Sequence, residues 1–275
     1  MIRKYKPTSP GRRDMTNIVG QSSTNNRKNK KITSKLTISL RGAVGRSAGR
    51  ISVQHRFAGA KKRYRLIDFK RNKYDISGTV ISIDYDPNRT CEIALISYPD
   101  GEYRYILSPA GLNIGDKIIS SEKAEALTGN AMPMKNIPLG VAIHNIELYP
   151  KAGGKFIRSA GTAGQLTAKE GKYVTVKMPS GEVRNFLAEC YATIGQVGLE
   201  EWKLISFGKA GRRHHMGVRP TTRGKARSDG HPLGGSYSQA MGRQPVDKWG
   251  NKSKGKKTRN RKHTSKYIVK DRRSK

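Results

Sequence analysis

The chain has 275 residues, of which 55 are Lys or Arg and 20 are Asp or Glu, so its formal net charge at pH 7 is +35. Hydrophobic residues make up 35% and the mean hydropathy is −0.70, which excludes a large hydrophobic enzyme. The two cysteines, Cys91 and Cys190, exclude a disulfide framework and argue against a zinc site. No apolar run approaches the roughly 18 residues of a membrane span, and no secretory signal is expected at the basic start.

The positive charge lies in the two ends of the chain. Residues 1–75 hold 21 Lys or Arg against 3 Asp or Glu, residues 201–275 hold 22 against 4, and residues 76–200 hold 12 against 13. Like charges repel and the ends carry few apolar residues, so neither end is expected to build a core. A folded RNA supplies phosphates at the density these ends need. A solvated surface fits less well, because it would mix both signs.

Residues 1–60 are predicted to form a basic N-terminal extension. Within it, residues 41–50 interleave Gly with Arg. Gly lets the backbone approach a phosphate closely, while Arg binds phosphate with two N–H groups and stacks on bases. Residues 61–65 and 68–73 then mix basic with aromatic side chains. This pattern is typical of RNA binding.

Residues 61–128 are predicted to form an OB-fold barrel that binds RNA. Five short strands in about 55 residues suit this fold. They are expected at 76–85, 90–98 and 102–107, with two weaker ones near 108–110 and 117–120. Cys91 shares a strand face with Ile93 and Leu95, so we expect it to fill the core, in a reducing compartment.

A hairpin motif occurs twice, 80 residues apart. Tyr-Pro-Asp-Gly-Glu-Tyr-Arg at residues 98–104 returns as Met-Pro-Ser-Gly-Glu-Val-Arg at residues 178–184. Pro followed by Gly marks a tight turn, and the Glu-x-Arg that follows resumes a strand. Two copies favour two tandem barrels over a solenoid, although a chance match of two generic hairpins is an alternative.

Residues 129–200 are predicted to form the second barrel, of the SH3-like type. Its strands are expected at 141–148, 164–169, 173–178, 182–187 and 193–197, after a linker at 129–133. His144 lies on the same face of the first of these strands as Ala142, Ile146 and Leu148. We therefore expect it to be a structural residue of the barrel rather than a functional one. Helix is scarce, and residues 199–207, ended by Gly208, are the best candidate.

Residues 201–275 are predicted to form a basic C-terminal extension that contains a Gly-rich loop. Gly, Lys and Arg alternate at 208–213, 219–225 and 254–259. His214 and His215 lie among arginines, and that positive charge favours a phosphate there over a metal.

The whole chain resembles the family of the second protein of the large ribosomal subunit, of the bacterial or organellar type. The segments that carry the resemblance are 6–13, 68–73, 85–89, 104–107, 136–140, 144–145, 153–154, 158–162, 208–211, 217–220, 249–250 and 254–259. The resemblance implies a mostly β fold, an OB-fold and then an SH3-like barrel, flanked by long, irregular basic extensions threaded into large-subunit rRNA. It also implies roles in subunit association, tRNA binding and support of the peptidyl-transferase region.

The same resemblance implies the partners and the location. Large-subunit rRNA, the small subunit across the subunit interface and neighbouring ribosomal proteins are the expected partners, with no membrane and no homo-oligomer. We expect no metal site, no catalytic residue and no cofactor beyond Mg ions bound to nearby rRNA. The location is the ribosome, in a bacterial cytoplasm or in an organelle matrix or stroma.

The residues expected to bind RNA are basic side chains and one histidine in the matched or Gly-rich segments. They are Arg12, Arg13, Arg46, Arg50, Lys61, Lys62, Arg63, Lys70, Arg71, Lys73, Arg89, Arg158, Lys209, Arg212, Arg213, Arg219, Arg223, Lys225, His231, Lys254, Lys256, Lys257 and Arg259.

The chain departs from the family pattern in two places. Residues 57–61 keep one glycine of a family triplet, and Leu233 stands where the family has a second histidine after His231. His231 lacks a nucleophile partner and lies in a flexible Gly-rich loop, so RNA contact is favoured over catalysis. A structural rRNA-binding protein accounts best for all the patterns. A nucleic-acid chaperone or compaction protein is the alternative, and a His-dependent transferase the least favoured.

Overall fold

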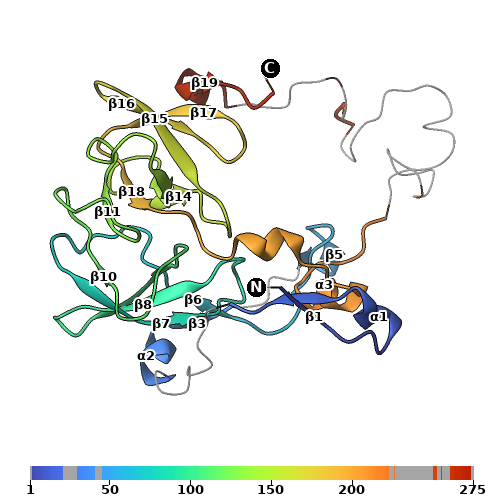
Figure 1. Ribbon diagram of the computed structural model, residues 1–275. Coiled ribbons are helices and arrows are strands. Elements are labelled where there is room, and N and C mark those ends of the chain that lie inside the picture. The colour runs from blue at the N-terminus through green and yellow to red at the C-terminus, as the bar shows by residue number, and fades with distance from the viewer. Residues whose placement is uncertain are drawn as a thin grey trace. The chain divides into compact units, whose positions relative to one another are not determined.

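The computed structural model describes residues 2–20, 30–40, 45–222, 226, 250–252, 255 and 261–273 (Figure 1). The chain forms two compact units. The first contains residues 1–41, 61–210 and 266–275, and the second contains residues 42–60 and 211–265. Both barrels belong to the first unit.

The first barrel is an antiparallel sheet in the order β10-β7-β8-β9 (Figure 1). Its strands are β7 (Gly78–Asp84), β8 (Ile93–Ser97), β9 (Tyr103–Leu107) and β10 (Lys117–Ile118). Val80, Ile96 and Ile106 pack in its core. The weak strand expected at 108–110 is absent. Pro109 makes one bridge to Val197 instead, because proline has no N–H to extend a ladder.

The second barrel is a sheet in the order β11-β18-β12-β15-β16-β17-β19. Its strands are β11 (Ala131–Pro133), β12 (Ala142–His144), β15 (Gly164–Glu170), β16 (Tyr173–Lys177), β17 (Val183–Leu187), β18 (Tyr191–Ile194) and β19 (Ile268–Lys270). A side ribbon pairs β13 (Ile146–Glu147) with β14 (Gly154–Phe156). The expected fold class, an OB-fold followed by an SH3-like barrel, is confirmed.

Two details of the second barrel differ from the expectation. The segment 129–133 is not a linker, since β11 is buried and pairs with β18. The strand expected at 141–148 is broken at Asn145, whose φ of 52° turns the chain from β12 into β13. Both differences come from tertiary pairing, which a short polar or Pro-containing segment does not reveal by itself.

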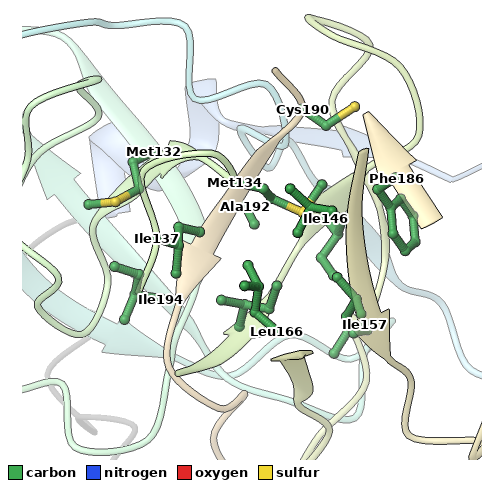
Figure 2. Close-up of a cluster of buried hydrophobic side chains, with 13 residues drawn as sticks. Met132, Met134, Ile137, Ile146, Ile157, Leu166, Phe186, Cys190, Ala192 and Ile194 are labelled. Carbon is green, nitrogen blue, oxygen red and sulfur yellow. The ribbon is translucent and has the colours of Figure 1, made fainter. Parts of the chain in front are cut away.

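The core of the second barrel is a cluster of buried side chains from nearly all of its strands (Figure 2). Met134, Ile143 and Leu166 have no exposed surface. Each such side chain contributes roughly 1.5–3 kcal/mol through burial. Cys190 belongs to this core, and burial raises the pKa of its thiol to about 12.

Cys91 is a core residue, as expected, but of a different cluster. It packs with Leu107 and Val197, not with Ile93 and Leu95. Burial raises the pKa of its thiol to about 11. Both cysteines are therefore kept in the protonated, unreactive form at neutral pH.

The repeated sequence motif is a repeated hairpin. Ser97 pairs with Tyr103 in β8–β9, and Lys177 pairs with Val183 in β16–β17, so the registers also differ by 80. The preceding strands, β7 and β15, each carry a bulge at the corresponding place. The two copies thus share their strand register and the preceding bulge as well as their sequence, which favours a repeat over a chance match of two generic hairpins.

Both repeated turns use a glycine in the left-handed region. Gly101 has φ 79° and Gly181 has φ 85°, and nothing lies within 4 Å of a Cβ at either position. We expect Gly101→Val or Gly181→Val to cost about 1–3 kcal/mol through backbone strain alone. Thermal unfolding of each variant measures this. Ser180→Val, in the same turn at negative φ, is the control, and an equal loss for Ser180→Val would contradict the explanation.

His144 is a barrel residue, as predicted. Its side chain is fully buried, and its Nδ1 lies 2.8 Å from the Gly195 carbonyl oxygen. The pKa of His144 is lowered to about 4, chiefly by burial and also by the nearby charge of Arg71, against the effect of the hydrogen bond to Gly195. The ring is therefore neutral at physiological pH, with Nδ1 as the donor to Gly195.

This depressed pKa predicts acid sensitivity. The unfolded chain binds a proton near pH 6.5 and the folded chain only near pH 4, so stability is lost as the pH falls from 6.5 towards 4. The expected loss between pH 7 and pH 5 is about 2 kcal/mol. Urea unfolding at the two pH values measures it. In His144→Gln the pH dependence over this range should be largely absent, whereas an unchanged dependence would contradict the assignment.

The two basic extensions pair with each other within the first unit. The N-terminal part forms β1 (Ile2–Lys4), α1 (Pro10–Arg13) and β2 (Thr16–Ile18), with β1 and β2 antiparallel. Thr16 N–H donates to the Ser206 carbonyl at 2.9 Å, and Ser206 N–H donates to the Thr16 hydroxyl at 2.8 Å. Charge alone did not predict this pairing.

Further along, α2 (Lys30–Lys35) and the ribbon of β3 (Thr37–Ser39) with β6 (Arg63–Arg65) lie on the OB barrel, where Ile32 and Leu36 pack against Tyr105. The helix expected at 199–207 is shorter and of the 3-10 type, η1 (Glu200–Leu204). A second 3-10 helix, η3 (Lys262–Tyr267), leads into β19.

The second unit is also made from both extensions. It contains the hairpin of β4 (Arg46–Ser47) with β5 (Arg50–Ile51), and α3 (Ala210–His215) reaches into it. Ala60 N–H donates to the His215 carbonyl at 2.8 Å, and the Phe57 and His214 rings lie 4.1 Å apart. The N- and C-terminal extensions thus interleave here as well.

Candidate nucleic-acid interface

A solvent-open hollow of about 530 Å³ lies where the 88–90 loop of the OB barrel meets the second barrel. It is lined by Asn88, Arg89, Thr90, Lys155, Ile157, Arg158, Ser159, Thr162, Met178, Pro179 and Ser180. Three of these side chains are cationic, four carry hydroxyl groups and none is a carboxylate. Such a lining suits an anion that accepts several hydrogen bonds.

Two arginines of this hollow flank one aromatic ring. The guanidinium carbons of Arg89 and Arg158 lie 5.0 Å and 4.7 Å from the centre of the Phe69 ring. Arg89 is paired with the buried Asp86 carboxylate at 3.2 Å. Stacking on the ring fixes each planar group while leaving N–H donors for a ligand.

Unlike Arg89, Arg158 has no carboxylate partner among the residues that the structure describes. Its Nη1 donates to the Gly154 carbonyl at 3.4 Å. Burial lowers the pKa of Arg158, and the like charge of Arg89 lowers it further. Both effects disfavour the positive charge of Arg158, whereas a bound anion would favour it. The pair of arginines therefore suits an anionic ligand.

The segment that carries Arg158 is fixed by bonds between the barrels. Ala160 N–H donates to the Thr90 hydroxyl at 3.0 Å, and Gly154 N–H donates to the Phe69 carbonyl at 2.8 Å. These bonds bring Phe69 and Thr90 of the first barrel next to the segment 154–160 of the second. The spacing of these residues in the sequence does not predict this contact.

The turn before this segment is built on Glu147, which is 2% exposed. Its two carboxylate oxygens accept from the N–H groups of Gly153 at 2.8 Å, Lys151 at 3.2 Å and Tyr191 at 3.1 Å. A buried carboxylate with three backbone donors is a rigid support.

Lys155 was missed by the sequence reasoning. It is exposed and lines the hollow beside Arg158. The signal that could have found it is the Gly153-Gly154-Lys155 run, in which Gly allows close approach next to a cation.

The other residues of the first unit that were predicted to bind RNA differ in their exposure to solvent. Arg12, Arg13, Lys61, Arg63, Lys70 and Lys209 are exposed, and Lys62 is half-buried. The Arg12 guanidinium lies 5.3 Å from the Tyr5 ring centre. The backbone pairing of Thr16 with Ser206 brings the segment that carries Arg12 and Arg13 close to the segment that carries Lys209.

Arg71 was expected to bind RNA, but its side chain is buried in the protein. It is 3% exposed, has φ 51°, and its Nη2 donates to the Gly129 carbonyl at 3.1 Å. Burial lowers its pKa, against the effect of Tyr98 and Asp68. Its side chain serves the protein interior, so the expected RNA contact is not available to it in this conformation.

Lys73 is engaged by two carboxylates. It pairs with Asp100, and with Glu102 at 2.6 Å. Burial lowers its pKa, but the hydrogen bonds to these two carboxylates outweigh burial and raise it. An RNA contact by this lysine would have to break or share these pairs.

In the second unit, Arg213 and Arg219 are exposed and Arg212 is half-buried. Arg46 and Arg50 lie in the β4–β5 hairpin, and their side chains are not described. Seven further predicted residues lie outside the described part of the chain: Arg223, Lys225, His231, Lys254, Lys256, Lys257 and Arg259.

Among the residues that the structure describes, no three His, Cys, Asp or Glu side chains gather in a way that could hold a metal ion. None of the helices described is both long enough and apolar enough to cross a membrane.

Two joined β-barrels, a hollow lined by cations and paired basic extensions are features typical of a nucleic-acid-binding protein. The family model for Ribosomal Proteins L2, RNA binding N-terminal domain, matches residues 33–120, and that for Ribosomal Proteins L2, C-terminal domain, matches residues 127–250. The chain belongs to the L2 family of large-subunit ribosomal proteins, which are structural RNA-binding proteins of the ribosome.

Proposed function

We propose that this chain is a primary rRNA-binding protein whose basic extensions thread into large-subunit rRNA. In that position it supports subunit association, tRNA binding and the peptidyl-transferase region, and contacts the small subunit and neighbouring ribosomal proteins. The two barrels, over residues 61–128 and 129–200, act as the rigid RNA-binding body. Residues 1–60 and 201–275 act as the extensions.

The hollow around Arg89 and Arg158 is the observation that carries this proposal. Its three cations, with no carboxylate in the lining, match a sugar-phosphate backbone. Arginines held against Phe69 are pre-organised, so less conformational entropy is lost on binding. The cationic residues of the extensions then add contacts that are less specific to RNA sequence.

A nucleic-acid chaperone or compaction protein is the alternative. Such a protein needs the charge but not a shaped hollow between two barrels. Sedimentation separates the two functions. A ribosomal component stays with the large subunit through a high-salt wash, whereas a chaperone is removed by the same wash.

Binding to large-subunit rRNA should weaken steeply with salt, because each neutralised phosphate releases counterions. We expect Arg12→Gln, Arg13→Gln and Lys209→Gln together to lower the log–log salt slope by about 2, at roughly 0.7–0.9 per phosphate contact. Mobility shift across a range of salt concentrations measures the slope.

The matched control neutralises three exposed lysines of the barrels, Lys117, Lys123 and Lys172. The net charge changes equally, so a general loss of attraction affects both triple variants alike. An equal change of slope in the control would show that the extensions have no special share in binding.

A further inference from the structure

A second hollow, of about 690 Å³, is formed by loops of both barrels. The loop residues near 75 and 122 belong to the first barrel, and those near 134, 150 and 190 belong to the second. The lining consists of two tyrosines, two prolines, one serine, three lysines and three carboxylates. Its volume lies within the roughly 300–1,000 Å³ that is typical of ligand sites. Its carboxylates distinguish it from the hollow around Arg89 and Arg158, which has none.

The two tyrosines form an aromatic surface in this hollow. The ring centres of Tyr74 and Tyr191 lie 5.4 Å apart, with the planes tilted by 44°. Tyr74 is 37% exposed and Tyr191 is half-buried. Among the described residues, no Lys or Arg of the chain itself lies over either ring. The pair is therefore open to a ligand from outside the chain.

Two of the carboxylates adjoin the tyrosines in the sequence. Asp75 directly follows Tyr74, and its Oδ1 accepts a hydrogen bond from the hydroxyl of the buried Ser121. Glu189 is exposed and precedes Tyr191 by two residues. A carboxylate accepts several hydrogen bonds, so the bond from Ser121 fixes Asp75 and still leaves acceptor positions for a ligand.

Negative charge also acts on the tyrosine hydroxyls themselves. The pKa of Tyr191 is raised to about 12, chiefly by burial. The other causes are the neighbouring Tyr74 and the carboxylates of Glu122, Asp75 and Glu147. A cation at the aromatic pair would therefore be attracted both by the rings and by the carboxylates around them.

The three lysines of the lining do not prevent this. Lys123, Lys135 and Lys151 are exposed, and a long flexible stem lets each ammonium group turn towards water. Lys135 already lies 3.7 Å from the Glu122 carboxylate. A phosphate, by contrast, would meet three carboxylates in this hollow. The lining therefore favours a protein partner over RNA.

Arginine is the side chain that fits these groups best. Its planar guanidinium lies flat on a tyrosine ring and can donate two N–H groups to one carboxylate, whereas the lysine ammonium is a strongly hydrated point charge. The chain itself contains such a contact, since the Arg12 guanidinium lies 5.3 Å from the Tyr5 ring centre. Tyrosine and arginine are also enriched at protein–protein interfaces.

We propose that this hollow binds an arginine side chain of a neighbouring ribosomal protein, with the guanidinium on the Tyr74–Tyr191 pair and the Asp75 and Glu189 carboxylates as its acceptors. The inference rests on the proposed function, in which neighbouring ribosomal proteins are partners. It adds the place and the chemistry of one such contact.

The test titrates the full chain with a blocked peptide, acetyl-Gly-Gly-Arg-Gly-Gly-amide, and with the same peptide carrying citrulline, the neutral isostere of arginine. The ring signals of Tyr74 and Tyr191 are followed by NMR. We expect the arginine peptide to bind about fivefold more tightly, the value of one exposed ion pair with one cation–π contact. A chain of net charge +35 would by general electrostatics repel arginine more than citrulline, so this preference identifies a local site.

The double variant Asp75→Asn with Glu189→Gln should lose the preference for arginine. Asn keeps an acceptor for the Ser121 hydroxyl and readily adopts the φ of 60° at position 75, so the fold is maintained. The matched control is Glu125→Gln with Glu170→Gln. It neutralises two exposed carboxylates of the same barrels outside the lining, and it should keep the preference.

Equal binding of the two peptides to the unaltered protein, or a preference that the double variant retains, would overturn the proposal. Adenosine 5′-monophosphate is titrated in parallel as the probe for RNA. If it binds at Tyr74 and Tyr191 more tightly than the arginine peptide, the hollow is a site for an unstacked base instead. Binding of large-subunit rRNA is measured by mobility shift. If rRNA binds but the two peptides do not differ, only the arginine site is wrong, whereas absence of rRNA binding would contradict the proposed function itself.

Discussion

Removal of the two stacked arginines of the hollow around Arg89 and Arg158 is expected to lower the affinity for large-subunit rRNA by about a hundredfold. The double variant is Arg89→Gln with Arg158→Gln. Each guanidinium that bonds a phosphate contributes roughly 1.5–3 kcal/mol as a hydrogen bond to a charged group. The two lie over one Phe69 ring, so both losses fall on a single binding site.

Arg158→Gln alone should lower the affinity about tenfold without lowering stability, because Arg158 pairs with no carboxylate in the described part of the chain. Arg89→Gln differs, since it weakens the support of the buried Asp86. Among the described residues Asp86 then retains Arg65, at 3.7 Å, as its cationic partner, and the Asn88 N–H as a donor at 2.9 Å. The single Arg158 variant therefore separates binding from folding.

Arg184→Gln is a closely matched control. Arg184 also lies over aromatic rings, 5.3 Å from Phe156 and 5.7 Å from Phe186, but it does not line the hollow. Affinity for an rRNA transcript at fixed salt, measured by mobility shift, should be nearly unchanged in this control. A double variant within threefold of the unaltered protein would show that the hollow is not a principal binding site.

The features that the sequence predicted best are turns and strands, which depend on residues close together in the chain. Gly101 and Gly181 lie after Pro-x in both copies of the repeat, and a turn with positive φ is what such a residue order favours. The strands on either side follow from apolar alternation, which depends only on the chain itself. These features survive in the structure with small shifts at strand ends.

What depends on distant partners was not predictable. Nothing in a run of basic residues distinguishes Arg71, which is buried against Gly129, from Lys70, which is exposed. The pairing of Thr16 with Ser206 joins segments 190 residues apart. The charge pattern indicates that a basic extension binds an anion. It does not show which of the basic side chains make contacts within the protein instead.

The candidate site shows the same division. Arg89 and Arg158 were each predicted as RNA-binding, but only the fold brings them to one ring.

The second large effect is expected from Glu147, a residue that touches no ligand. Glu147→Ala removes the acceptor of the buried Gly153 N–H and of the partly buried N–H groups of Lys151 and Tyr191. Unsatisfied buried donors cost about 1–3 kcal/mol each, so we expect a loss of roughly 3–5 kcal/mol in the free energy of unfolding. Chemical denaturation measures it.

Glu147→Gln should not restore this stability. Both carboxylate oxygens accept, one from Gly153 and the other from Lys151 and Tyr191, so either orientation of the amide places its NH₂ against an N–H donor. Glu170→Ala, at the exposed end of β15, is the control for loss of a glutamate and should change stability by less than about 0.5 kcal/mol.

The effect of Glu147→Ala on RNA binding tests the link from the core to the hollow. Removal of a negative charge from a protein of net charge +35 should, by electrostatics alone, strengthen binding to RNA. We expect the opposite, a loss of about tenfold in the folded variant, because the turn held by Glu147 leads directly to Lys155 and Arg158. The measurement is rRNA affinity under conditions in which circular dichroism shows the variant to be folded. Unchanged or tighter binding would mean that the hollow keeps its shape without this carboxylate, and that its cations are positioned by Phe69 alone.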